Sequence, residues 1–357
     1  MLAPARRRRI GPPSQISGAG IDTPASRRAA IIDAMGEPLR WGVIGTGGIA
    51  AVFAADLELT ESGRVVAVGS REPARAEAFA ERFGVPNRHG SYEALVSDPQ
   101  VDAVYVATTH PLHHAHAELA LRAGKPVLLE KPFTVTAAQA RELVALARER
   151  ELFLMEAMWT RFLPHVARIR ELLAQGALGE IVTVIADHGQ WFAQDREHRL
   201  FAPELGGGAL LDLGVYPVAF ASMVLGAPSE IQSMITPAFT GVDGQTSMLF
   251  RYESGAHAVL TCTLAAKSPT RAAIVGTLAR IEVEGDFYAP SRLTLTSRDG
   301  EQVSFDGRRD RRGLRFEADE VARCLREGLL ESPLMPLEES IAIMETMEAV
   351  LEGATRA

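Results

Sequence analysis

Lys131 stands out among the charged residues because lysine is rare in this chain. The 357 residues include 34 arginines but only three lysines, the other two being Lys125 and Lys267. A chain that favours arginine so strongly is expected to keep lysine where a compact, titratable ammonium matters. The alternative is that Lys131 pairs with its neighbour Glu130 or stays solvated.

Tyr216 is the second candidate for proton transfer. A tyrosine has an ordinary pKa of about 10, so it is a poor acid or base near neutral pH unless an ammonium stabilises its phenolate. A contact with Lys131 is therefore expected to lower the pKa of Tyr216 and make it a usable general acid/base. Asp212 lies four residues earlier, on the same face of a predicted helix, and the glycines at 206–208 are expected to leave space for a ligand. Taken alone, Tyr216 would be a half-buried core aromatic and Asp212 a charge at a helix start.

A glycine-rich turn near the start of the patterned sequence predicts a dinucleotide site. The segment GTGGIA, residues 45–50, follows an apolar run, opens a helical stretch and fits the pattern G-x-G-x-x-G/A. Its glycines permit a tight turn and a close backbone approach, and a pyrophosphate then sits at the helix N-terminus. The residues expected to contact the cofactor here are Gly45, Thr46, Gly47, Gly48 and Ile49.

Ser70 and Arg71 indicate which dinucleotide is bound. They follow the second apolar run, where an acidic residue would bind the adenosine ribose of NAD. A hydroxyl and a guanidinium suit a 2′-phosphate instead, which favours NADP and leaves NAD as the second possibility. The alternative is that Ser70 caps the next helix and Arg71 is solvated.

Four histidines fall within residues 110–116, directly after the apolar run that ends at Ala107. A metal site is one interpretation, but few Cys, Asp or Glu residues lie nearby, and no metal is expected. A loop at the carboxyl end of such a strand is where the nicotinamide ribose lies. The candidates for this contact are Thr108, Thr109, His110 and His113.

Alternating apolar runs and helical stretches must position these residues. The runs at 39–45, 63–69, 101–107, 126–130 and 152–156 are continuously apolar, as strands covered on both faces should be, and helices are expected between them. The sequence therefore predicts an α/β protein with an N-terminal, doubly wound parallel sheet of Rossmann type over residues 37–156.

Residues 157–357 have a different pattern. Helices are expected at about 162–174 and through Tyr216, and a hairpin is expected around Glu253-Ser254-Gly255. Two further helices, at about 314–327 and 337–352, close the chain. We predict a C-terminal α+β domain that is built on a mostly antiparallel sheet and binds substrate, with the last helix able to pack back on the first domain.

Composition limits the partners. The net charge is −8, and six arginines lie in residues 1–36, so the remainder is strongly acidic and disfavours nucleic acid and anionic membrane surfaces. No apolar run approaches the roughly 20 residues of a membrane span. The two separated cysteines fit a reducing cytoplasm. Residues 1–36, rich in Arg, Pro, Ser and Gly, are predicted to be a disordered leader.

Taken together, GTGGIA, the turn Glu130-Lys131-Pro132 and the segment GGGALLDLGVYP resemble the Gfo/Idh/MocA oxidoreductase family. MEAMWTRFLP at 155–164, Ser70-Arg71 and the C-terminal tail resemble its branch of dihydrodiol and NADP-dependent D-xylose dehydrogenases. The resemblance implies that Lys131 contacts cofactor and substrate, that Tyr216 transfers the proton, and that Glu130, Trp159 and Arg161 lie beside the cofactor. Much of the family has histidine at the place of Tyr216 and asparagine at that of His110.

The resemblance also implies the reaction and the partners. We expect hydride transfer between nicotinamide and a hydroxyl or carbonyl carbon of a sugar, polyol or trans-dihydrodiol, in a homodimer or higher homo-oligomer formed through the C-terminal sheet. The alternatives are an oxidoreductase of another sugar derivative, such as an inositol or anhydro-ketose, and a regulator that senses NADP(H) without turnover. The residues Lys131, Asp212 and Tyr216 argue against a sensor, which has no need of them.

Overall fold

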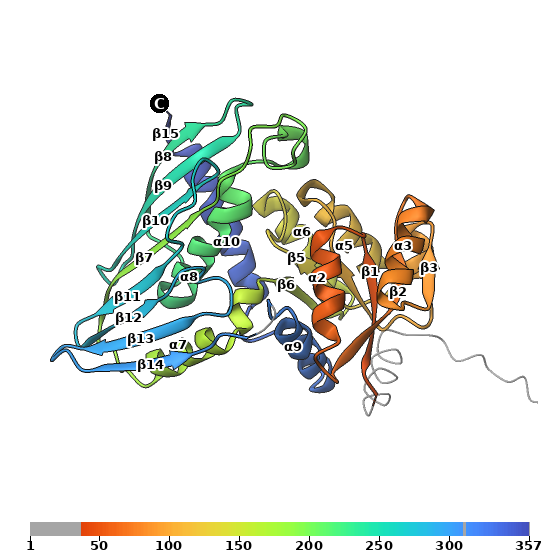
Figure 1. The fold of residues 1–357 in the computed structure, drawn as a ribbon, viewed down its shortest axis with the longest axis horizontal. Coiled ribbons are helices and arrows are strands. Elements are labelled where there is room, and N and C mark those ends of the chain that lie inside the picture. The colour runs from red at the N-terminus through yellow and green to blue at the C-terminus, as the bar shows by residue number, and fades with distance from the viewer. Residues whose placement is uncertain (1–36, 310–311, 357) are drawn as a thin grey trace, which may run out of the picture.

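A computed structural model describes residues 37–309 and 312–356 (Figure 1). The predicted leader, residues 1–36, lies outside the described residues.

The first sheet is parallel, with the strand order β3-β2-β1-β4-β5-β6. This is the order of a Rossmann fold, in which successive strands are added on one side of β1 up to β3 and on its other side from β4 onward. Its strands are β1 (Leu39–Ile44), β2 (Gly63–Gly69), β3 (Asn87–His89), β4 (Ala103–Val106), β5 (Val127–Glu130) and β6 (Leu154–Ala157). The apolar runs predicted five of them, and β4 to β6 are buried along their whole length.

Helices connect these strands and cover the sheet. Thr136 caps the helix that follows β5 by accepting a hydrogen bond from the backbone N–H of Gln139, which is the contact that a Thr-x-x-Gln sequence favours at a helix start. The side chain of Gln139 reaches one residue further back than a capping box requires and accepts from Val135 N–H. The helices are α2 (Gly48–Leu57), α3 (Pro73–Phe83), α4 (Tyr92–Val96), α5 (His113–Arg122) and α6 (Ala137–Glu149).

The second sheet has the strand order β14-β13-β12-β11-β7-β10-β9-β8-β15. It is mostly antiparallel, as predicted, with parallel pairing only of β7 with β10 and of β8 with β15. The predicted hairpin is formed by β9 and β10. The strands are β7 (Ile181–Gly189), β8 (Glu230–Pro237), β9 (Asp243–Arg251), β10 (His257–Thr263), β11 (Ala272–Gly276), β12 (Ala279–Val283), β13 (Arg292–Ser297), β14 (Gln302–Asp306) and β15 (Thr355–Arg356).

One face of this sheet is covered by helices and the other is open (Figure 1). Buried and exposed residues accordingly alternate along β9 and β10. α10 contacts α6 and β6 on one side and α8 and β8 on the other, so it joins the two sheets. The helices are α7 (Pro164–Ala174), α8 (Val215–Leu225), α9 (Arg315–Arg326) and α10 (Leu337–Glu352).

One helical stretch among the described residues, Pro203–Leu225, is long and apolar enough to cross a membrane by length and composition alone. Its most apolar window is 78% buried inside the protein, and the core helix of a globular protein passes the same test. The stretch includes α8, which packs on β7 and β10.

Candidate active site

The end of β5 and the start of α8 meet through Lys131. Its ammonium Nζ donates to the backbone oxygen of Asp212 at 2.9 Å and to the Asp212 carboxylate at 3.1 Å. The same Nζ lies 4.9 Å from the centre of the Tyr216 ring. The structure therefore brings together the three predicted catalytic residues, of which Lys131 and Asp212 are 81 positions apart in the sequence.

The contact of Lys131 with Tyr216 is with the ring face and not with the hydroxyl. The Tyr216 hydroxyl accepts a hydrogen bond of 3.0 Å from the indole N–H of Trp159. Burial raises the pKa of Tyr216 to about 12, although Lys131 and Trp159 both act to lower it. The pKa of Tyr216 is therefore raised and not lowered, contrary to our expectation. Removal from water destabilises the phenolate more than the neighbouring ammonium stabilises it.

Asp212 is the shared anionic partner of Lys131 and Arg199. Burial alone would raise its pKa, but Lys131, Arg199 and His110 together lower it well below its ordinary value. Arg199 makes two hydrogen bonds to the carboxylate, of 3.1 and 3.2 Å, and His110 Nε2 lies 3.7 Å from it. Asp212 is therefore a buried anion with two cationic partners.

Asp212 belongs to a π-helical turn, Leu210–Gly214, that leads into α8. We expected Asp212 and Tyr216 to lie one α-turn apart on one face, and the wider turn changes that relation. It lets both the backbone oxygen and the carboxylate of Asp212 reach Lys131. Such turns occur frequently at functional sites.

Glu130 is a separate buried carboxyl and not the ion-pair partner of Lys131. It accepts from the Tyr105 hydroxyl and from the backbone N–H of Lys131. Burial raises the pKa of Glu130 to about 7, against the effects of Tyr105 and Lys131. Burial also works against the ammonium of Lys131, yet Asp212, Tyr216 and Glu130 together raise its pKa, so this lysine is charged at neutral pH.

The glycines at 206–208 serve the packing of their own loop. A Cβ on Gly208 would lie 2.0 Å from the Asp243 carboxylate, and one on Gly207 would lie 2.7 Å from the backbone oxygen of Leu200. Asp243 accepts from the backbone N–H of Leu210 and so caps the π-helical turn. We expected these glycines to make room for a ligand, but protein atoms occupy that space.

The turn between β1 and α2 fits a dinucleotide phosphate. Gly45 has a φ of 102°, and a Cβ there would lie 2.8 Å from the backbone oxygen of Ala107. No atom lies within 4 Å of a Cβ built on Gly47 or Gly48, so the backbone can be approached closely. No side chain caps α2 at Gly47. Its first N–H groups are available to an anion, together with those of Thr46 and Ile49 in the same turn.

Ser70 and Arg71 lie at the end of β2, beside this turn. The Ser70 hydroxyl accepts from the backbone N–H of Glu72, so it supports the start of α3 as the alternative interpretation had it. Arg71 is exposed. Burial lowers the pKa of His116, and the charge of Arg71 lowers it further.

The histidines after β4 bond to backbone and side-chain oxygens. Nδ1 of His113 lies 2.8 Å from the Pro132 carbonyl, and Nδ1 of His110 lies 3.2 Å from that of Gly206. His116 bonds to the Thr108 hydroxyl at 3.1 Å. Within residues 37–309 and 312–356, no three His, Cys, Asp or Glu side chains are grouped to hold a metal. Thr109 precedes the 3₁₀ turn of His110–Leu112 without capping it.

Arg161 is positioned differently from our expectation. Its guanidinium is buried, makes hydrogen bonds of 2.7 and 3.0 Å to Glu339 on α10, and donates to the backbone oxygen of Ala219. A guanidinium so fully bonded inside the protein ties α8 to α10 and has little left for a cofactor. Trp159, two residues earlier, does reach the site, through Tyr216.

Sequence reasoning missed several residues around Tyr216. The rings of His188 and Tyr288 lie 5.3 and 4.8 Å from the Tyr216 ring and stack on each other at 4.3 Å. Gln190 bonds to both of them, and Arg199 pairs with Asp212. His188 could have been suspected from the sequence only because it lies near the end of a strand. No local sequence feature identifies Tyr288, Gln190 or Arg199 as part of the site.

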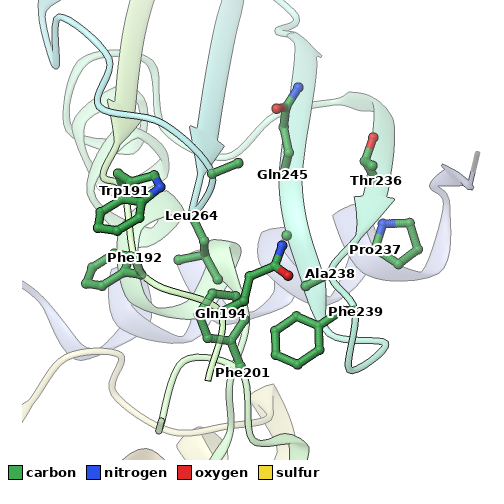
Figure 2. A pocket seen from close by; sticks show the side chains of 12 residues that line it. Trp191, Phe192, Gln194, Phe201, Thr236, Pro237, Ala238, Phe239, Gln245 and Leu264 are labelled. Carbon is green, nitrogen blue, oxygen red and sulfur yellow. The ribbon is translucent and has the colours of Figure 1, made fainter. Parts of the chain in front are cut away.

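An aromatic pocket adjoins the loop that begins at Gln190. The cavity has a volume of about 390 Å³. Its lining includes the rings of Phe192, Phe201 and Phe239, which Figure 2 shows. The Phe201 and Phe239 rings lie 5.3 Å apart, between that loop and the turn from β8 to β9. The loop contributes both to this pocket and, through Arg199, to the ion pair with Asp212.

Comparison with known protein families agrees with this architecture. The profile described as "Oxidoreductase family, NAD-binding Rossmann fold" matches residues 39–158, and that of the GFO/IDH/MocA C-terminal domain matches 166–282. The chain belongs to the Gfo/Idh/MocA oxidoreductase family, as the sequence motifs predicted, and is an NAD(P)-dependent oxidoreductase by that membership.

Similar proteins with named activities cover nearly the whole chain. Mouse trans-1,2-dihydrobenzene-1,2-diol dehydrogenase is 40% identical over 322 residues, which are 87% of this chain and 95% of the relative. D-xylose 1-dehydrogenase (NADP(+)) of Hypocrea jecorina is 40% identical over 364 residues, covering 89% and 93%. A 3-ketoreductase from Actinomadura kijaniata, solved with NADP and TDP-benzene, has a TM-score of 0.80 at 31% identity, covering 90% and 99%.

Proposed function

We propose that this protein is an NADP-dependent oxidoreductase that acts on a hydroxyl or carbonyl carbon of a sugar, polyol or trans-dihydrodiol, with Tyr216 as the general acid/base. The observation that carries the proposal is the convergence of four side chains: Lys131 and Trp159, which follow β5 and β6, and Asp212 and Tyr216, which lie in the π-helical turn and in α8. The names of the relatives support the substrate classes.

The chain supplies the groups that such a cofactor requires. The turn at 45–49 would hold the pyrophosphate, Ser70 and Arg71 the adenosine end, and the loop after β4 the nicotinamide ribose. When bound, the nicotinamide supplies or accepts the hydride. These assignments are supported by the open space at Gly47 and Gly48 and by the exposed guanidinium of Arg71.

The protein's own part is to move a proton at the substrate oxygen. In the reducing direction the Tyr216 hydroxyl donates its proton to the forming alkoxide, and in the oxidising direction it recovers it. The ammonium of Lys131, held by Asp212, stabilises the phenolate that Tyr216 becomes. Because the hydroxyl already accepts the N–H of Trp159, its own proton is free to face the substrate.

Nicotinamide absorbance at saturating NADP or NADPH tests this function. The purified protein is assayed against aldoses, inositols, an anhydro-ketose and a trans-dihydrodiol, in both directions. Turnover with at least one class is expected. Tight NADP binding without turnover on any of them would favour the NADP(H) sensor and overturn the proposal.

We also propose that the open face of the second sheet binds a second copy of the chain. Ile185, Val259 and Leu249 lie in register on three neighbouring strands and are each more than two-fifths exposed. Such an apolar row on a sheet face is typical of an interface. Light scattering should give a dimer for the wild type and a monomer for Val259→Lys, whereas Val303→Lys, on β14 at the sheet edge, should leave the dimer intact. A monomeric wild type would refute this.

A further inference from the structure

A chain of hydrogen bonds lies beside Tyr216 and joins three elements. His188, near the end of β7, is 1% exposed, and its Nδ1 lies 3.2 Å from the carbonyl oxygen of Leu213. Its Nε2 lies 2.9 Å from the amide nitrogen of Gln190. The same amide nitrogen lies 3.3 Å from the hydroxyl of Tyr288, which follows β12.

The direction of each bond in this chain is forced. The carbonyl of Leu213 can only accept, so Nδ1 of His188 carries a hydrogen, and Nε2 of the neutral ring is then an acceptor. The ring is neutral near pH 7 because burial and the nearby Lys131 lower the pKa of His188 to about 4. Gln190 must therefore turn its NH₂ group toward the ring, and the second N–H of that group donates to Tyr288.

Two polar groups are left over at the end of the chain. They are the O–H hydrogen of Tyr288 and the amide oxygen of Gln190, and neither has another partner among the residues that the structure describes. Both residues are half-buried, and they flank the same 3.3 Å contact. The Tyr288 ring lies 4.8 Å from that of Tyr216 and 6.0 Å from that of Trp159, so the pair borders the proton-transfer group.

One donor beside one acceptor matches a hydroxyl group, which can accept and donate at once. We propose that Gln190 and Tyr288 bind a substrate hydroxyl other than the one that reacts, and that His188 positions Gln190 for this contact. The inference rests on the proposed function and requires a substrate with at least one hydroxyl besides the reacting one. An aldose, a cyclic polyol or a trans-dihydrodiol meets this requirement, whereas a substrate without such a hydroxyl would leave the two polar groups unpaired.

A series of monodeoxy substrates tests the contact directly. The full chain with NADP is assayed with an aldose or inositol that it turns over, with each monodeoxy analogue of it, and with a trans-dihydrodiol. Tyr288→Phe should lower kcat/KM for the parent compound about tenfold, mainly through KM. It should leave one particular deoxy analogue unchanged, because this analogue lacks the hydroxyl that Tyr288 binds.

The matched control is Tyr252→Phe, a buried tyrosine after β9 at the hairpin end of the sheet. It should alter none of these ratios. His188→Phe keeps a ring against Tyr288 but removes the acceptor for Gln190. It should reduce the preference for the polyol over that deoxy analogue by a similar factor.

The outcomes separate this inference from the function on which it rests. Turnover of a polyol with equal losses for the parent and all deoxy analogues in Tyr288→Phe would mean that Tyr288 only packs, and would overturn the inference alone. If the wild type turns over only the dihydrodiol, Tyr288→Phe should lower kcat/KM for that substrate, and an unchanged value would overturn the inference. Absence of turnover with every substrate class overturns the proposed function and this inference with it.

Discussion

The ammonium of Lys131 lies 4.9 Å from the centre of the Tyr216 ring while both of its described hydrogen bonds go to Asp212. The lysine is thus anchored by one residue and acts electrostatically on another. A cation over an aromatic face is itself favourable, by about 0.5–2 kcal/mol. Its main consequence for chemistry is that a positive charge stays beside the phenol whether or not the phenol is ionised.

Tyr216→Phe removes the group that we assign to proton transfer. We expect kcat to fall on the order of 10²-fold or more, because general acid/base catalysis contributes that much. The ring, its contact with Lys131 and the packing of α8 are retained, so cofactor affinity and thermal unfolding should change little. Stopped-flow or steady-state turnover, with NADP titration as the control, measures this. Near-normal turnover would contradict the assignment.

Lys131→Arg keeps the charge but changes its shape. A planar guanidinium cannot reproduce an ammonium that bonds to the backbone and the carboxylate of Asp212 while facing the Tyr216 ring. We expect a loss of roughly 10- to 100-fold in kcat, because small misplacements of a catalytic group cost that much. Lys267→Arg is the control, since Lys267 is exposed and pairs only with Asp286 among the described residues. Full activity of Lys131→Arg would reduce Lys131 to a structural ion-pair partner.

The parallel sheet could be predicted because strands covered on both faces leave continuous apolar runs. β3 could not, since Asn87–His89 is a polar edge strand of three residues. Parts of the site could also be predicted from the sequence, namely Lys131, because lysine is rare in this chain, and the glycine-rich turn at 45–50. Their partners were not: the bond from Lys131 to Asp212 and the contact of Gly208 with Asp243 are set by tertiary packing between distant segments.

The pKa of Tyr216 shows the same limit. Proximity to an ammonium predicted a lowered pKa, but the sequence cannot say how completely the hydroxyl is removed from water. Tyr216 is 7% exposed, and burial is the largest influence on its pKa. The sequence can therefore predict that a charged residue lies near Tyr216 more reliably than it can predict whether the pKa of Tyr216 is raised or lowered.

Glu156 on β6 should make stability depend on pH. It is 0% exposed, and burial raises its pKa to about 7 from an ordinary 4.5. Because the pKa is higher in the folded state, the carboxyl's contribution to stability is full below about pH 4.5 and is lost as pH rises to about 7. The shift corresponds to roughly 3 kcal/mol.

The side chain introduced by Glu156→Gln does not titrate. Between pH 4.5 and pH 8 the free energy of unfolding of the wild type should therefore fall by up to roughly 3 kcal/mol relative to that of this variant. Urea unfolding at both pH values measures the gain. Glu352→Gln, at an exposed position near the end of α10, should show none. A constant difference between wild type and Glu156→Gln at the two pH values would show that Glu156 is not held neutral in the folded protein.

Arg71 should decide between the two nicotinamide cofactors. We propose that its exposed guanidinium, at the end of β2, pairs with the 2′-phosphate of NADP, and a hydrogen bond to a charged group is worth about 1.5–3 kcal/mol. Arg71→Ala should therefore weaken NADP binding roughly 10- to 100-fold and leave NAD binding nearly unchanged, as measured by fluorescence titration with each cofactor. Arg75→Ala is the matched control, because Arg75 lies one turn further along α3 and pairs with Glu72. Equal losses for NAD and NADP, or tighter binding of NAD by the wild type, would remove the basis for assigning NADP to this site.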